Sequence, residues 1–221
     1  MPRQRAARRA PARDRSGDPL DEPEKRRAIL HAAVKVFADK GYHGCRIADV
    51  ARQAGVAYGL VYHYFRNKDA LLEKVFEEQW AIFIAAIRAI REGPGSAAER
   101  LAGVCRFAVD VLRTAPAAVK VLMLEVARTP DALRVGTTRQ TFEEAVRLVS
   151  EIVREGQERG EIRARLDPLV AAAGLLGALE RSLTVLVLGL VPADSEAEVE
   201  RAKEQVVDFV LSGVTGGRRA N

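Results

Sequence analysis

Residues 47–65 constrain the fold of this chain more than any other stretch. Their sequence, IADVARQAGVAYGLVYHYF, has the spacing of two short helices joined by a tight turn. Small Ala51 stands where the helices would cross closely, Gly55 stands at the turn, and Val56 is expected to be buried just after it. The second helix carries Tyr and His side chains in a row. This pattern predicts a helix-turn-helix unit whose second helix enters a DNA groove.

The segments on either side predict helices that pack against this unit. Apolar residues recur at steps of three and four between Glu24 and Lys40, and Gly41 is expected to end that helix. Asn67 is expected to cap a longer helix that ends before residues 93–95. This helix is too long for a small DNA-binding domain alone, so its second half is expected to enter the next domain.

The remainder also reads as helices, with clear start and stop residues and no strand signal. Capping boxes begin helices at 96–99 and 195–198, Pro116 suits a first helical position, Asp167 caps another helix, and Gly160 ends a long one that starts near Asp131. We therefore predict an all-α fold of about nine helices, with a three-helix DNA-binding domain at 22–70 and a helical effector-binding and dimerisation domain at 71–215.

Both termini have a composition typical of disorder. Residues 1–21 are rich in Arg, Pro, Ala and Asp without an apolar period, and 216–221 form a short tail. Two readings of the arm stay open, a solvated tail or expression remnant, or a basic arm that contacts DNA. The formal net charge of +5 is compatible with an anionic partner.

The sequence argues against catalysis, metals and a membrane span. All three histidines precede residue 80, the two cysteines lie far apart, and no nucleotide-binding or nucleophile motif occurs, so no catalytic residue, metal or cofactor is predicted. The apolar run 168–191 carries Glu180 and Arg181 at its centre, which favours a buried helix. With no secretory signal visible, we expect a cytoplasmic protein.

A wider set of residue types and spacings extends across residues 24–75: Gly41-Tyr42, Ile47, Asp49-Val50-Ala51, Ala54-Gly55-Val56, Gly59, Val61-Tyr62, Tyr64-Phe65, Asn67-Lys68 and Leu71-Leu72. In these positions the chain resembles the DNA-binding domain of the TetR/AcrR family of bacterial transcriptional regulators. The resemblance implies a homodimer that binds a double-stranded DNA operator and carries an all-helical C-terminal domain for a small effector.

Carried over by position, the resemblance places Tyr58 and Gly59 at base edges, Tyr62 and Tyr64 at phosphates or base methyls, and Lys68 at the DNA backbone. Packing of the tyrosine rings in a small core is the alternative. Leu60 and Tyr64 depart from the residues common in the family, so the operator sequence cannot be inferred. The predicted DNA-binding residues are Arg46, Ala57, Tyr58, Gly59, Leu60, Tyr62, His63, Tyr64 and Lys68.

The second domain offers broad apolar faces with a few charges, which would suit an apolar anion. The alternative is that its aromatic residues are plain core and its arginines are surface. The segments Leu124-Glu125 with Arg128, and 155–167, are also similar to the FadR-like fatty-acid-metabolism branch, which implies a long-chain acyl-CoA effector. The predicted effector-binding residues are Trp80, Phe83, Phe107, Met123, Arg128, Phe142, Val146 and Arg181.

Small residues in the helix at 168–191 allow another helix to approach closely, and with the last helix it would form a two-fold dimer face. The alternative places this helix inside its own subunit. The predicted interface residues are Gly174, Gly177, Ala178, Leu183, Leu186, Val206 and Phe209.

We therefore expect a dimeric repressor that a small lipophilic effector, with acyl-CoA as the candidate, releases from a palindromic operator. Two other functions stay open. One is a multidrug-type repressor that binds cationic or aromatic compounds, and the other is a helical small-molecule-binding protein without a DNA role.

Overall fold

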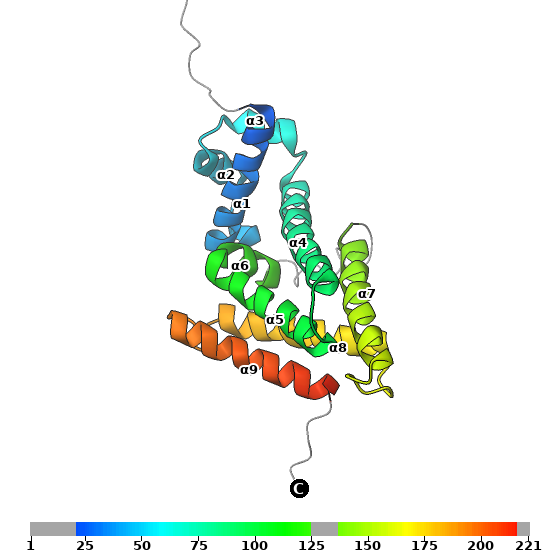
Figure 1. Cartoon of the computed structure of the whole chain (residues 1–221). Coiled ribbons are helices and arrows are strands. Elements are labelled where there is room, and N and C mark those ends of the chain that lie inside the picture. The colour runs from blue at the N-terminus through cyan, green and yellow to red at the C-terminus, as the bar shows by residue number, and fades with distance from the viewer. Residues whose placement is uncertain (1–20, 125–136, 216–221) are drawn as a thin grey trace, which may run out of the picture.

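The computed structural model describes residues 21–124 and 137–215, so most of the predicted arm at 1–21 and the tail at 216–221 lie outside it. Within this part the chain forms nine helices and no strand, which confirms the predicted all-α fold (Figure 1). The helices are α1 Glu22–Gly44, α2 Ile47–Ala54, α3 Tyr58–Tyr64, α4 Lys68–Glu92, α5 Ala97–Thr114, α6 Pro116–Leu124, α7 Thr137–Glu158, α8 Pro168–Val187 and α9 Glu196–Thr215.

The helix starts follow the side chains that can satisfy free backbone N–H groups. The Asn67 side chain accepts from the Ala70 N–H at 2.8 Å, and Ser96 and Glu99 form the predicted capping box. Helix α1 begins earlier than predicted because Asp21 and Glu24 form a capping box of their own. It also continues to Gly44 beyond a kink at Gly41, whose φ of 70° interrupts the helical geometry.

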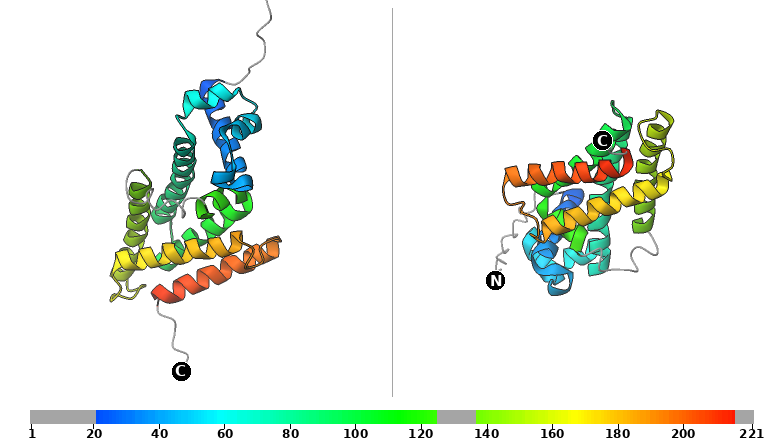
Figure 2. Two further views of the ribbon diagram at one scale, coloured as in Figure 1. Left: turned by 180° about the vertical axis from the view of Figure 1, so that it is seen from behind. Right: turned by 90° about the horizontal axis from the view of Figure 1, so that it is seen from below.

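The helices enclose two hydrophobic cores. The upper core in Figure 1 joins α1, α2 and α3, and the side chains Ile29, Phe37, Val50 and Val61 are almost completely buried in it. The lower core joins the second half of α4 to α5, α7, α8 and α9. Figure 2 shows from behind and from below that α8 and α9 lie side by side at the end of the molecule opposite α3.

Two helices contribute to both cores. Helix α4 places Leu71 and Val75 in the upper core and Ile84 and Ile87 in the lower one. Helix α6 also places side chains in both cores. The predicted domain boundary between residues 70 and 71 falls inside α4, and it stays a prediction.

Helix α6 has buried residues on opposite sides. Ala118 and Val121 are buried in the upper core, whereas Val119 is buried in the lower core. This arrangement follows from helical geometry, because neighbouring residues point about 100° apart and can face different partners. The shared helix ties the two cores together.

One helix in the described part of the chain, α8, is long and apolar enough to cross a membrane by length and composition alone. Core helices often meet the same criteria, and Ala172, Leu175, Leu176 and Leu179 of α8 are buried in the lower core. The buried side of α8 agrees with the prediction that the apolar run 168–191 forms a buried helix.

Helix α7 packs so closely at Gly156 that a side chain would not fit. A Cβ at this position would lie 2.5 Å from the Ala97 Cβ and 2.8 Å from the Ile162 Cδ1. We predict that Gly156→Ala lowers the free energy of unfolding by about 1–3 kcal/mol, the usual cost of overpacking a core. Chemical denaturation would measure this loss. Gly59→Ala is the control, because no atom lies within 4 Å of its added Cβ, and equal destabilisation by both variants would contradict the packing argument.

Candidate functional site

The turn between α2 and α3 is fixed by backbone geometry. Gly55 adopts the left-handed conformation, with φ 68° and ψ 28°, and the Val56 N–H donates to the Ala51 carbonyl at 3.0 Å. At the other end of α2, the Arg46 N–H donates to the Asp49 carboxylate at 2.9 Å. The Arg46 side chain is therefore not used as a cap, and it is exposed.

Helix α3 is held by its buried side so that its other side faces solvent. Val61 is fully buried and Phe65, directly after the helix, is 5% exposed. Tyr58 and Tyr62 lie on the opposite side, 54% and 44% exposed, with their hydroxyls 3.2 Å apart. The alternative of tyrosines packed in the core therefore does not describe these two residues.

The other predicted DNA-contacting residues on α3 differ in exposure. Ala57, Gly59 and His63 are exposed, whereas Leu60 is half-buried. The outward side of α3 thus combines two phenol groups, an imidazole and a glycine. Such a surface can donate and accept hydrogen bonds and lets a flat or grooved partner approach the backbone closely at Gly59.

Tyr64 and Lys68 are already engaged within the protein. The Tyr64 hydroxyl donates to the Glu22 carbonyl at 3.2 Å, and its ring packs against the upper core. The Lys68 ammonium donates to the Tyr42 carbonyl at 2.6 Å and to the Cys45 carbonyl at 3.2 Å. It also lies 4.3 Å from the centre of the Tyr42 ring. Their DNA contacts stay predictions, and both side chains also stabilise the domain.

Tyr42 positions the start of α4, a role that the sequence pattern did not assign to it. Its hydroxyl donates to the Asp69 carboxylate, and burial together with this hydrogen bond raises the pKa of Tyr42 above its ordinary value. Because Tyr42 also accepts the Lys68 ammonium on its ring and carbonyl, it orients the start of α4 next to the helix-turn-helix. Its place in the Gly41-Tyr42 pair was the available signal.

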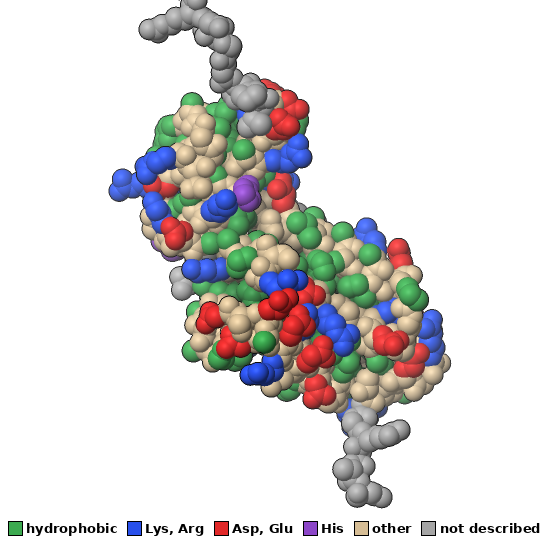
Figure 3. All heavy atoms as spheres, turned by 60° about the vertical axis from the view of Figure 1, so that its left-hand side comes forward, with side chains coloured by type: hydrophobic (Ala, Val, Ile, Leu, Met, Phe, Trp, Pro, Cys, Tyr) green, Lys and Arg blue, Asp and Glu red, His purple; other side chains and the backbone are tan. Residues whose placement is uncertain are grey.

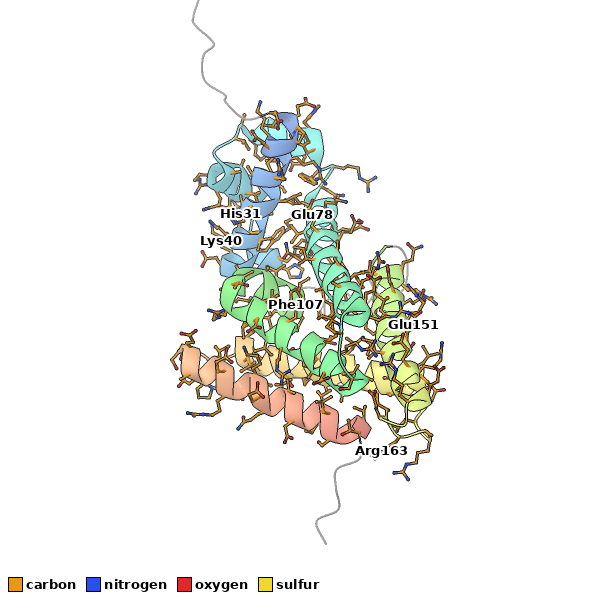
Figure 4. All side chains as sticks on the ribbon, viewed as in Figure 1. His31, Lys40, Glu78, Phe107, Glu151 and Arg163 are labelled. Carbon is orange, nitrogen blue, oxygen red and sulfur yellow. The ribbon has the colours of Figure 1, made fainter. Side chains whose placement is uncertain are left out.

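The predicted effector-binding residues fall into two groups. Trp80, Phe83 and Phe107 form a continuous half-buried aromatic run, with ring centres 5.6 and 6.3 Å apart, and Phe76 extends it at 5.7 Å from Trp80. Figure 4 marks Phe107 on α5, where its ring stacks on Phe83 of α4. Met123 and Val146 are half-buried against the lower core.

The remaining effector-site predictions lie farther out. Phe142 is 41% exposed on α7, and Arg181 is exposed on α8. Arg128 lies outside the described residues. The structure therefore joins the aromatic members of the set directly, and the whole set stays a prediction.

The predicted interface residues also separate into exposed and buried groups. Gly174 and Gly177 are exposed on α8, and Phe209 on α9 is 68% exposed. Ala178 and Val206 are half-buried, whereas Leu183 and Leu186 are buried within the subunit. The alternative of an internal helix thus describes one side of α8, and its other side faces outward.

The described residues offer little for catalysis. No group of three or more His, Cys, Asp or Glu side chains in this part of the chain could hold a metal ion. Burial raises the pKa of the Cys105 thiol to about 12, so it is neutral and unreactive at physiological pH. A helix-turn-helix joined through shared helices to a second helical core is the architecture of a DNA-binding regulator.

Comparisons with known proteins define the class further. Residues 29–75 match the model for bacterial regulatory proteins of the tetR family, and residues 94–184 match a tetracyclin repressor-like C-terminal domain. The chain belongs to the TetR family. It is a DNA-binding transcriptional regulator, and the relatives are named as regulators and not as enzymes, as predicted.

Three matches that cover most of the chain carry names that refer to fatty acid metabolism, fatty acid degradation or FadR. The fatty acid metabolism regulator protein of Bacillus subtilis is 28% identical over 186 residues, which are 84% of this chain and 93% of that protein. The structure of the fatty acid degradation regulator FadR from Bacillus halodurans superposes with a TM-score of 0.78 at 27% identity, covering 91% of this chain and all of that one. Bacillus subtilis FadR in complex with stearoyl-CoA gives a TM-score of 0.70 at 28% identity, covering 85% and 98%.

Gly59 provides a test of close approach by DNA. Its added Cβ meets no atom in the free protein, and replacing a helical Gly by Ala typically gains about 0.5–1 kcal/mol. We predict that Gly59→Ala stabilises the protein in thermal unfolding but weakens operator binding in fluorescence anisotropy. If the variant bound operator as tightly as the wild type, α3 would not meet DNA closely at Gly59.

Proposed function

We propose that this protein is a dimeric, cytoplasmic repressor that a long-chain acyl-CoA releases from a palindromic operator. One observation carries the effector assignment: the chain matches nearly the full length of a FadR structure that holds stearoyl-CoA. The half-buried aromatic run at Trp80, Phe83 and Phe107 supports it, because it offers apolar surface that an acyl chain could cover.

Operator recognition is proposed for the outward side of α3. Tyr58 and Tyr62 would contact base edges and phosphates, and the free side chain of Arg46 would add a phosphate contact. In a two-fold dimer two copies of α3 would read half-sites about 34–36 Å apart, or a multiple of this distance.

The dimer is proposed for the outward side of α8 and α9. Exposed apolar side chains occur at the start of α8, just after its end and on α9: Leu169, Val170, Leu188, Leu190 and Phe209. The exposed Gly174 and Gly177 between them lower the stability of α8 unless another helix approaches closely, and neither meets a neighbour within the subunit. Burying this surface against a second copy would remove a large apolar patch from water.

Repression and release follow from differential affinity. An acyl-CoA that binds better to a conformer with wrongly spaced α3 helices lowers the operator affinity, and operator lowers the acyl-CoA affinity by the same factor. The two cores share α4 and α6, so a displacement of the aromatic run on α4 is transmitted to the start of that helix at Lys68.

The chain has a single tryptophan, Trp80, inside the proposed acyl site, which makes binding visible. We predict that stearoyl-CoA shifts the fluorescence emission of Trp80 and, over the same concentration range, weakens binding to the upstream region of the protein's own gene about 5–150-fold. The reason is that an acyl chain replaces ring contacts around Trp80. Emission spectra and anisotropy titrations would be recorded on one sample.

Lipophilic cations serve as the matched control for the multidrug-type alternative. They are expected to leave both signals unchanged. Release of DNA by the cations and not by stearoyl-CoA would replace the proposed effector, and release by stearoyl-CoA without any change in Trp80 emission would place the acyl site elsewhere.

The dimer face is tested at Phe209. We predict that Phe209→Asp converts the dimer into monomers, because a carboxylate would have to be desolvated in an apolar interface. Light scattering coupled to size-exclusion chromatography measures the mass. Ile82→Asp is the control, since Ile82 is 55% exposed on α4, away from α8 and α9. A dimer that persists in Phe209→Asp would contradict this face.

A further inference from the structure

A groove follows the seam between the two cores. It has a volume of about 590 Å³ and is open to solvent, with walls from α1, α2 and α6. Figure 3 shows this side of the molecule, where Lys and Arg side chains occur on both sides of the waist. The charged lining residues of the groove are Lys35, Asp39, Lys40, Asp49, Arg52 and Lys120.

The charges of this seam groove are unequal. Its four cations, Lys35, Lys40, Arg52 and Lys120, face two carboxylates. Asp49 is already compensated, because the Lys40 ammonium lies 2.9 Å and the Arg52 guanidinium 3.6 Å from its Oδ1. These contacts lower the pKa of Asp49, and the hydrogen bond from Lys40 contributes most to this shift. The groove therefore keeps a positive excess.

Lys35 and Lys120 supply part of that excess, and Lys40 and Arg52 together also exceed the charge of Asp49 by one. The Lys35 and Lys120 side chains are exposed, and neither makes an ion pair within residues 21–124 or 137–215. They come from different walls, Lys35 from α1 and Lys120 from α6. Asp39 is the remaining carboxylate, and it partly offsets these two charges.

A second groove of about 370 Å³ continues the first one toward α4. The two share Lys35, Pro116 and Ala117, and the second adds Arg27, His31 and Glu78, whose carboxylate is paired with Arg26 at 3.2 Å. Arg27, His31 and Lys35 follow one another at steps of four residues, so they line one side of α1. Figure 4 marks His31 and Lys40 along α1, with Lys40 near the end that approaches α6. An anion with several charged groups could extend from one groove into the other.

We propose that the seam groove binds a phosphate-bearing small molecule, with Lys35 and Lys120 holding the phosphate oxygens from opposite walls. If the ligand is an acyl-CoA, this assignment rests on the proposed function, and the groove would bind the phosphates of its coenzyme A group. Bound there, the anion connects α1 of the DNA-binding core to α6, and so it fixes the position of one relative to the other.

DNA phosphates are the competing partner for these cations. Helix α3 packs near the N-terminal end of α1, where Tyr64 bonds to Glu22, whereas the groove lies along residues 35–40. At 1.5 Å per residue, about 15 helical residues separate these positions by roughly 20 Å. The α1 wall of the groove thus lies away from the Glu22 contact of α3, but the α2 wall with Arg52 belongs to the helix-turn-helix, so the variants below distinguish the two partners.

The test is calorimetric titration of the full-length protein with pyrophosphate and with coenzyme A lacking an acyl chain. Both are expected to bind. Lys35→Ala and Lys120→Ala should each weaken binding about tenfold, since each removes one unit charge close to the anion near a protein surface. Asp39→Asn should strengthen it, because it removes the uncompensated negative charge. Lys74→Ala on α4 is the matched control and should change nothing.

Three results would overturn the proposal. These are no binding of either probe, equal affinities in wild type, Lys35→Ala and Lys120→Ala, or weaker operator binding by these two variants in the absence of ligand, which would assign the lysines to DNA.

The outcomes are separable from those of the proposed function. If stearoyl-CoA fails to release DNA but pyrophosphate binds in a Lys120-dependent way, the effector is wrong and the seam site stands. If stearoyl-CoA binds and releases DNA equally well in both lysine variants, the seam site is wrong and the effector stands.

Discussion

The insertion of α6 into the DNA-binding core is the packing interaction on which the rest of the structure depends. Ala118 and Val121 are buried among residues of α1 and α2, although they lie more than 50 residues farther along the chain. Without them the upper core would consist only of three helices and the first turns of α4, a size at which burial barely offsets conformational entropy. The DNA-binding unit therefore gains buried apolar surface from α6, and a movement between the two would break these contacts.

This dependence determines what can change when a ligand binds. Helix α3 is short and is anchored by fully buried Val61, so its shape is fixed by the core and not by the effector. Lys68 joins the start of α4 to the Tyr42 and Cys45 carbonyl groups at the end of α1. What can change is accordingly the orientation of the whole helix-turn-helix relative to α5, α8 and α9. Helix α4 connects the two covalently, and α6 connects them through packing of Ala118 and Val121.

The helices and their ends could be predicted from the sequence, but the contacts between distant helices could not. Caps such as Asn67 and Ser96, and the turn at Gly55, act through hydrogen bonds or dihedral angles within a few residues, so they could be predicted locally, whereas Gly41 produces a kink and not the predicted end of α1. The exposure of Tyr58 also followed from its position next to the turn. In contrast, the pairing of Lys68 with the Tyr42 carbonyl, and the division of α8 into a buried side with Leu183 and an outward side with Gly174, depend on helices that meet in space. The seam groove could not be predicted for the same reason, because its cations come from three separate helices.

The position of the seam groove sets a limit on how the two parts of an amphiphilic effector could act. The aromatic run on α4 and α5 lies within the regulatory domain, so an apolar group there changes packing on one side of the joint. Charges on α1 and α6 lie on either side of the joint itself, so a bound anion would alter the relative orientation directly. Because α6 is buried in both cores, a small shift of this helix must be matched by α1, since close-packed interiors transmit displacement and do not absorb it. An effector that engages both regions would thus act on α4 and α6 together, the two helices that the DNA-binding core shares with the rest of the protein.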